Sequence, residues 1–345
     1  MKPGDGRERQ TGGVIDEPTG SDTERPRAGA GLPAAGAILS GCRANPRSGA
    51  GGDVGAPAGE FKTRFLFPKA VAIDRDGAVC VACAGGFGGL LKARRKPDGG
   101  GFETVWEAEG GKEKWSVRGV AVGPGGDVFA TVVVGKDFQG VRRWSSDGTA
   151  AGSWAPAGPG DTSFCGPAGI AVDGAGCVYV VEAEWWGLEG GHRVQKFGPG
   201  GALLAAWGSK GSGEGQLNLP TGAALDREGN LVVADTYNSR LLTFAPDGAL
   251  LGARGVRGVG DGQFDRPQGA AFDAAGALYV ADTFNNHVQK FAPDGRWLAA
   301  WGRRGSGPGE FWLPCGIAVD AAGDVYVADT MNNRVQVFRP SAEEA

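Results

Sequence analysis

The chain has 345 residues, 65 of them glycine, and a formal net charge of −4. The small negative charge argues against broad electrostatic binding to nucleic acid or to an anionic membrane. No apolar run approaches the roughly 18 residues that a membrane-spanning helix needs. Glycine richness without a three-residue period excludes collagen and indicates many turns.

The N-terminal part of the chain differs in composition from the rest. Residues 1–35 mix glycine, proline and charged residues without an apolar period, which predicts a disordered tail. Next, Leu39-Ser40-Gly41-Cys42 fits a bacterial lipobox, and a lipid on Cys42 would anchor the domain outside the cytoplasmic membrane. The preceding stretch lies far from Met1 and is poor in leucine, isoleucine and valine, unlike a signal peptide. We therefore favour a cytoplasmic protein, with an envelope lipoprotein anchored at Cys42 as the alternative.

From Pro68 onward, one sequence template recurs. In its last copy, apolar runs at 316–320, 325–328 and 334–338 are separated by turn residues. Earlier copies add a Pro-Asp-Gly turn and a fourth run ending in Trp-Gly. Four short runs with turns between them predict an antiparallel meander of four strands. The residue that ends the first run marks six copies, at Asp74, Gly123 (in place of Asp), Asp173, Asp226, Asp273 and Asp320.

Six copies of a four-stranded unit predict an all-β fold, a six-bladed β-propeller of four-stranded antiparallel blades. We expect this domain over 36–340, with blades near 68–110, 114–155, 167–208, 220–255, 267–302 and 314–340. The last copy stops after its third strand, so an N-terminal strand is expected to close the ring. We favour 36–41, which resembles the fourth strand at 201–206, over the competing segment 61–67 with its alternating phenylalanines.

The run Asp329-Thr330-Met331-Asn332-Asn333-Arg334 and its counterparts at 235–244 and 282–291 resemble the NHL repeat. The preceding loop at 305–311 resembles it too. The resemblance is strong from about 160 to 339 and weak from 61 to 155. It implies a six-bladed propeller, and it implies a module that binds protein or RNA more often than an enzyme, although some similar propellers are enzymes.

The acid that ends the second strand and the arginine that opens the third invite a catalytic interpretation. The pairs are Asp235 with Arg240, Asp329 with Arg334, and Glu182 with Arg193; His287 replaces the arginine opposite Asp282. The first copy has Cys83 and Leu91 at these positions, and the second has Val132 and Gly140. Because both partners are absent together, we interpret the pairs as structural and assign no catalytic residue.

The residue after the repeat proline should line the mouth of the central channel. This ring reads Lys69, Arg118, Ala168, Thr221, Gln268 and Cys315. It holds no carboxylate, whereas hard cations need several oxygen ligands, so we predict no channel metal and no cofactor. Lys69 and Arg118 lie on adjacent blades and, with Gln268 of the same ring, could bind an anionic ligand; we favour the alternative, a rim of ordinary solvated charges.

Histidines and cysteines give little support for other chemistry. The two histidines, His192 and His287, cannot form a three-histidine zinc site, and His287 occupies an arginine position of the repeat. Cys80 and Cys83 lie in an expected strand, where residues three apart point to opposite faces. We therefore interpret both cysteines as small buried residues.

The loops between the second and third strands carry apolar side chains on one face of the propeller. Tyr237, Phe284 and Met331 share one repeat position, which favours packing between blades. Trp185 and Trp186 lie in an insertion at 184–191 that no other copy has, and they could form an exposed anchor or a lid over a neighbouring blade.

We therefore predict a monomeric, non-catalytic binding or scaffold module that engages a protein or peptide through this loop face. The first alternative is a propeller hydrolase or lyase acting on a small molecule at the channel mouth. The second is an RNA-binding propeller, which the nearly cancelling charges of the connecting loops disfavour.

Overall fold

The computed structural model describes residues 54–62, 66–85, 88–109, 114–135, 138–155, 163–183 and 191–340. The segments 1–35, 36–41 and 184–190, together with Cys42, lie outside these ranges. The described strands belong to the compact unit formed by residues 41–345.

The strands form six four-stranded antiparallel sheets, so the predicted six-bladed propeller is confirmed. Blade 1 contains β2 (Leu66–Ile73), β3 (Val79–Gly85), β4 (Gly89–Arg95) and β5 (Phe102–Glu109). Blade 2 contains β6 (Trp115–Val122), β7 (Val128–Val134), β8 (Phe138–Trp144) and β9 (Ala150–Trp154). Blade 3 contains β10 (Pro167–Val172), β11 (Val178–Glu182), β12 (Arg193–Phe197) and β13 (Leu203–Trp207).

The last three blades are the most regular. Blade 4 contains β14 (Gly222–Leu225), β15 (Leu231–Asp235), β16 (Arg240–Phe244) and β17 (Leu250–Arg254). Blade 5 contains β18 (Gly269–Phe272), β19 (Leu278–Asp282), β20 (His287–Phe291) and β21 (Trp297–Trp301). Blade 6 contains β22 (Pro314–Val319), β23 (Val325–Asp329), β24 (Arg334–Pro340) and β1 (Val54–Lys62). Single 3₁₀ turns join the second and third strands: η2 (Thr236–Asn238), η3 (Thr283–Asn285) and η4 (Thr330–Asn332).

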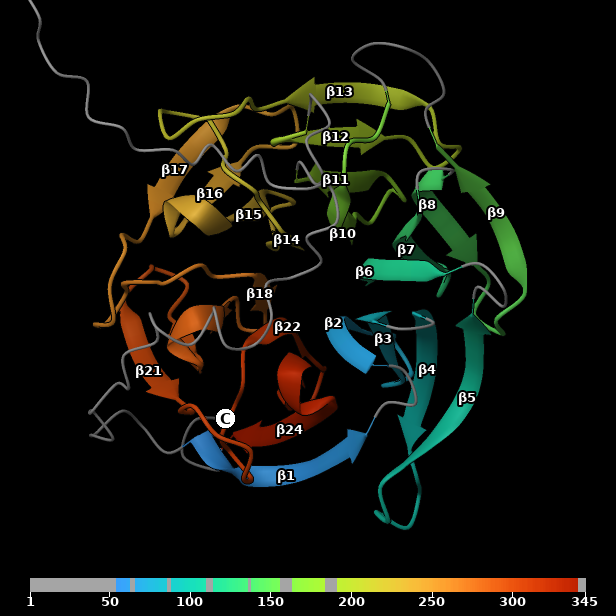
Figure 1. The fold of residues 1–345 in the computed structure, drawn as a ribbon, viewed down its shortest axis with the longest axis vertical. Coiled ribbons are helices and arrows are strands. Elements are labelled where there is room, and N and C mark those ends of the chain that lie inside the picture. The colour runs from blue at the N-terminus through green and yellow to red at the C-terminus, as the bar shows by residue number, and fades with distance from the viewer. Residues whose placement is uncertain are drawn as a thin grey trace, which may run out of the picture. The chain divides into compact units, whose positions relative to one another are not determined.

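The first strand of every blade lies innermost, around the centre of the ring (Figure 1). Adjacent inner strands approach closely because, in five of the six blades, a glycine follows the residue that lines the channel mouth. A Cβ on Gly222 would lie 2.3 Å from the Gln268 carbonyl oxygen, and one on Gly269 would lie 2.2 Å from that of Cys315. Any larger residue would force the blades apart, so the Pro-x-Gly motif sets the spacing around the channel.

The ring closes where β1 pairs antiparallel with β24, with Phe61 opposite Val335 and Lys62 opposite Arg334. Closure by an N-terminal strand is thus confirmed, but the preference for 36–41 is wrong, because Val54–Lys62 fills the fourth position of blade 6. The competing segment overlaps β1 only at its end. Glu60 accepts a hydrogen bond from Arg334 at 2.8 Å, and the Phe61 ring packs 4.4 Å from that of Phe102. Residues 36–41 offer neither an acid nor an aromatic ring for these contacts.

The hydrophobic core lies between blades rather than within one. Tyr179 and Val181 of blade 3 share a cluster with Leu231 and Phe244 of blade 4. The tryptophan that ends the fourth strand fills the gap between two blades: the Trp207 ring lies 6.3 Å from Tyr179 and 6.1 Å from Phe244. Such large aromatic side chains contribute much of the apolar area that each blade buries against the next.

Candidate ligand-binding loop face

One face of the propeller carries the turns between second and third strands and the connections between blades; we call it the loop face. The repeat acids lie beneath it. The Asp235 carboxylate is fully buried. It accepts hydrogen bonds from the Asn218 amide at 2.6 Å, from Asn238 Nδ2 at 2.8 Å and from Arg240 Nε at 2.8 Å. Both of its oxygens are therefore occupied by donors of the protein itself.

The other pairs have the same geometry. Arg334 Nε lies 2.8 Å from Asp329, Arg193 Nε lies 3.0 Å from Glu182, and His287 Nε2 lies 3.0 Å from Asp282. Burial raises the pKa of Asp235, Asp329 and Glu182 above the ordinary value, while the hydrogen bonds to each carboxylate oppose that shift.

These groups also hold the connection that precedes their blade. Arg240 Nη2 donates to the carbonyls of Gly213 and Gln216, each at 2.9 Å. Asn238 Nδ2 donates to the Gly211 carbonyl at 2.8 Å, and Asn332 Nδ2 makes the same contact with Gly305. The Asp, Asn and Arg of the repeat thus fix the backbone of the loop face; we call this set the loop latch.

The register of blade 1 corrects one alignment made from the sequence. Cys83 lies opposite Gly89, not Leu91, whereas Val132 lies opposite Gly140 as expected. Neither blade can form the loop latch at these positions. Cys80 and Cys83 are both buried and join two different hydrophobic clusters, one on each face of β3. Burial raises the pKa of the Cys80 thiol to about 12.

A second set of contacts ties each blade to the next. The residue before the third strand has a left-handed backbone, and it accepts a hydrogen bond from the residue before the next repeat proline. Asn286 Oδ1 thus accepts a hydrogen bond from the Leu313 amide at 2.9 Å. Asn333 Oδ1 accepts one from the Phe67 amide at 2.9 Å, which ties blade 6 to blade 1. His192 is buried and accepts from the Leu219 amide at 3.0 Å in the same way.

The channel ring places Lys69 in β2 and Arg118 in β6 on adjacent blades. Both are half-buried, as is Gln268, which precedes β18 of blade 5. Lys69 Nζ of blade 1 lies 3.6 Å from Cys315 Sγ of blade 6. Burial lowers the pKa of Arg118 to about 10, which leaves its guanidinium charged at neutral pH. Trp185 and Trp186 lie outside the described residues.

The structure reveals an aromatic and arginine cluster on the loop face that sequence reasoning missed. Tyr237 in η2 is 52% exposed, so the expectation that it packs between blades is wrong. The Arg266 guanidinium lies over two rings, 4.9 Å from the centre of Tyr237 and 4.5 Å from that of Phe284 in η3. The sequence does contain one sign of this cluster: Arg266 stands before the repeat proline, where other blades carry the apolar residues Leu219 and Leu313.

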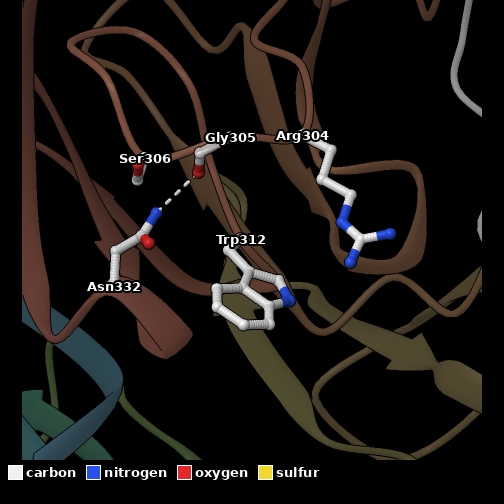
Figure 2. A pocket seen from close by; sticks show the side chains of 5 residues that line it. All are labelled: Arg304, Gly305, Ser306, Trp312 and Asn332. Atoms are coloured by element: carbon white, nitrogen blue, oxygen red, sulfur yellow. Dashed lines mark hydrogen bonds between the residues drawn. The ribbon is translucent and has the colours of Figure 1, made fainter. Parts of the chain in front are cut away.

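The loop face also carries an open pocket of about 260 Å³. It is lined by Arg304, Gly305, Ser306, Trp312 and Asn332. Figure 2 shows the Trp312 indole between Asn332 and the Arg304 side chain. The Arg304 guanidinium lies 5.9 Å from the centre of the indole ring. The pocket therefore offers an aromatic surface and a cation side by side.

Within the described ranges, no three His, Cys, Asp or Glu side chains group closely enough to hold a metal ion. The same part of the chain contains no helix of the length and apolarity needed to cross a membrane.

The family model of the NHL repeat matches residues 217–244, 264–291 and 311–338. Each match runs from the connection before a blade to its third strand, and so contains a repeat Asp and Asn together with Arg240, His287 or Arg334. Blades 4 to 6 of this six-bladed propeller are therefore NHL repeats. A search of curated proteins found no match to the chain.

Solved structures share its fold. A gluconolactonase from Xanthomonas campestris aligns with a TM-score of 0.60 at 17% identity, covering 87% of this chain and 98% of the other. A streptogramin B lyase aligns with a TM-score of 0.55 at 14% identity, covering 82% and 97%. Virginiamycin B lyase from Staphylococcus aureus aligns with a TM-score of 0.52 at 14% identity, covering 81% and 87%. At these identities the likeness is one of fold.

Proposed function

We propose that this NHL propeller is a non-catalytic binding module that takes a protein or peptide partner on its loop face. The observation that supports this best is that the loop face carries both the Tyr237–Arg266–Phe284 stack and the Trp312 pocket. Exposed aromatic rings on a fixed backbone are typical of interface hot spots, because they bury large area at small entropic cost.

The loop latches support the same function. They hold the connections rigid from beneath, so the exposed side chains above them are presented in one arrangement. Their carboxylates accept hydrogen bonds from arginine, asparagine and backbone donors, which suits a role in positioning the loops.

A selection from a phage-displayed library of random 12-residue peptides would test this function. We expect enriched peptides whose binding weakens about tenfold in Tyr237→Ala, as for loss of an aromatic hot-spot residue. Leu204→Ala is the matched control, since Leu204 is 58% exposed but lies on outer strand β13. Absence of any enriched peptide, or equal weakening by both substitutions, would contradict the proposal.

Trp185 and Trp186 belong to the connection between β11 and β12, which is the blade 3 counterpart of the turns that carry Tyr237 and Phe284. We propose that they extend the same binding surface. Replacing both by alanine should weaken the selected peptides and leave the unfolding temperature unchanged. Unchanged binding, or loss of folding, would reject this extension.

A second candidate is a hydrolase or lyase acting on a small molecule at the channel mouth, which the similarity in fold to a gluconolactonase and two lyases favours. Lys69 and Arg118 would there stabilise the negative charge that develops on the oxygen of a lactone or ester during hydrolysis, with Gln268 as a further contact. Hydrolysis of gluconolactone above the buffer rate, abolished by Lys69→Met, would support it.

A further inference from the structure

Arginines on the loop face fall into two groups. Arg303 Nη2 lies 2.9 Å from Glu310, and Arg257 Nε lies 3.9 Å from Asp265, so these two have carboxylate partners. Over the described part of the chain, Arg266 and Arg304 form no ion pair; their contacts are with aromatic rings. Although the charges of the connecting loops nearly cancel, the Arg266 and Arg304 guanidinium groups remain available to a ligand.

The aromatic rings beneath these two guanidinium groups orient them. Arg266 lies over Tyr237 of blade 4 and Phe284 of blade 5, and Arg304 lies over Trp312. A guanidinium that contacts a ring still presents its N–H groups at its edge, in the fork that matches a carboxylate. Holding the group in place before binding reduces the entropy lost on pairing.

A hydrogen bond links the two elements that carry these rings. Phe284 of η3 lies under Arg266, and Asn286, two residues further on, accepts a hydrogen bond from the Leu313 amide at 2.9 Å. Leu313 follows Trp312, which lines the pocket with Arg304. The turn of blade 5 on which Arg266 rests is thus tied to the connection before blade 6, which carries Arg304.

The charges around the surface favour separate carboxylates over a polyphosphate chain. Asp261 and Asp265 lie in the same connection as Arg266, Glu310 lies in the same connection as Arg304, and the whole chain has a net charge of −4. A nucleic acid carries a charge at every nucleotide and would meet these acids. A peptide can place carboxylates only where the cations are.

We propose that the loop face binds an extended acidic peptide segment, with one carboxylate paired to Arg266, another to Arg304, and an apolar side chain in the Trp312 pocket. This inference rests on the proposed function and specifies the class of partner. Because bidentate pairing with a carboxylate is strong and directional, Arg266 and Arg304 would then determine specificity.

The experiment is fluorescence anisotropy with labelled 12-residue peptides from the library selection, each compared with a version in which Asp and Glu are replaced by Asn and Gln. We expect the selected peptides to be rich in acidic residues. The neutral versions should bind about tenfold more weakly, as should Arg266→Gln and Arg304→Gln with the acidic peptides. Arg303→Gln and Arg257→Gln are the matched controls and should change binding less than about twofold, since both arginines are already paired.

Thermal unfolding of each variant checks that folding is retained, and Arg266→Lys, which keeps the charge, should recover part of the affinity lost in Arg266→Gln.

Equal weakening by all four glutamine variants would overturn the inference in favour of general charge attraction. Tighter binding of a 12-nucleotide oligouridine than of the acidic peptides would overturn it in favour of nucleic acid. Enrichment of neutral peptides that depend on Tyr237 but not on Arg266 would overturn it and leave the proposed function standing; no enrichment at all would remove both.

Discussion

Blades 4 to 6 and blades 1 and 2 make the same sheets by different polar contacts. In blade 6, Asp329 and Arg334 form the loop latch. In blade 1, buried Lys92 pairs with Asp74 at 2.8 Å and also donates to the Ser146 carbonyl of blade 2 at 3.0 Å. In blade 2, Thr131 Oγ1 donates to the Ala168 carbonyl of blade 3 at 2.6 Å. Blade 6 is therefore tied to the connection that precedes it, whereas blades 1 and 2 are tied to the blade that follows, so no single residue pair is common to all blades.

The largest effect should come from breaking the loop latch of blade 6. Asp329→Ala removes the buried carboxylate that accepts from Arg334 and from the Trp312 amide, and leaves buried Arg334 with only the more exposed Glu60 carboxylate. We expect this to lower the free energy of unfolding by about 3–5 kcal/mol. Urea denaturation measures this. Glu228→Ala, an exposed site on a turn of blade 4, is the control and should change stability by less than about 0.5 kcal/mol. A loss below 1 kcal/mol for Asp329→Ala would show that the latch does little for stability.

Removing the blade 1 link should cost less. Lys92→Met leaves Asp74 without its ion-pair partner, but Asp74 Oδ1 still accepts the amides of Asp76 and Ala78. We expect a loss of about 2–3 kcal/mol, the usual range for a hydrogen-bonded charge. Lys96→Met, an exposed site in the same blade, is the control. If Lys92→Met destabilises as much as Asp329→Ala, the Lys92–Asp74 ion pair and the loop latch of blade 6 contribute equally to the free energy of unfolding.

The smallest effect should come from the inner strands, which all blades share. Gly222→Ala would place a Cβ 2.3 Å from the Gln268 carbonyl, and blades 4 and 5 would have to separate slightly. We expect a loss of about 1–3 kcal/mol by thermal unfolding, as for overpacking. Gly59 has no atom within 4 Å of its would-be Cβ, so Gly59→Ala should be tolerated. A neutral Gly222→Ala would mean that the inner strands have room to move.

The repeat period was sufficient to predict six blades, because each blade needs the same turns and the same apolar alternation. Pairing within one blade was also accessible, since Asp235 and Arg240 are neighbours across a single turn. The closing strand was not, because its contacts with Arg334 and Phe102 join residues far apart in the sequence. The Arg266 stack was missed for a similar reason: Tyr237 and Phe284 belong to different blades.

The seam between β1 and β24 has a consequence for how the chain is made. Glu60 and Arg334, which meet there, are 274 residues apart. β1, the first of the described strands to be synthesised, therefore cannot pair until β24, the last of them, has been made. Until then, a nascent chain with five complete blades still exposes an unpaired strand to its neighbours. Ring closure is thus the last step in assembling the propeller, and only that step covers the strand edges that could start aggregation.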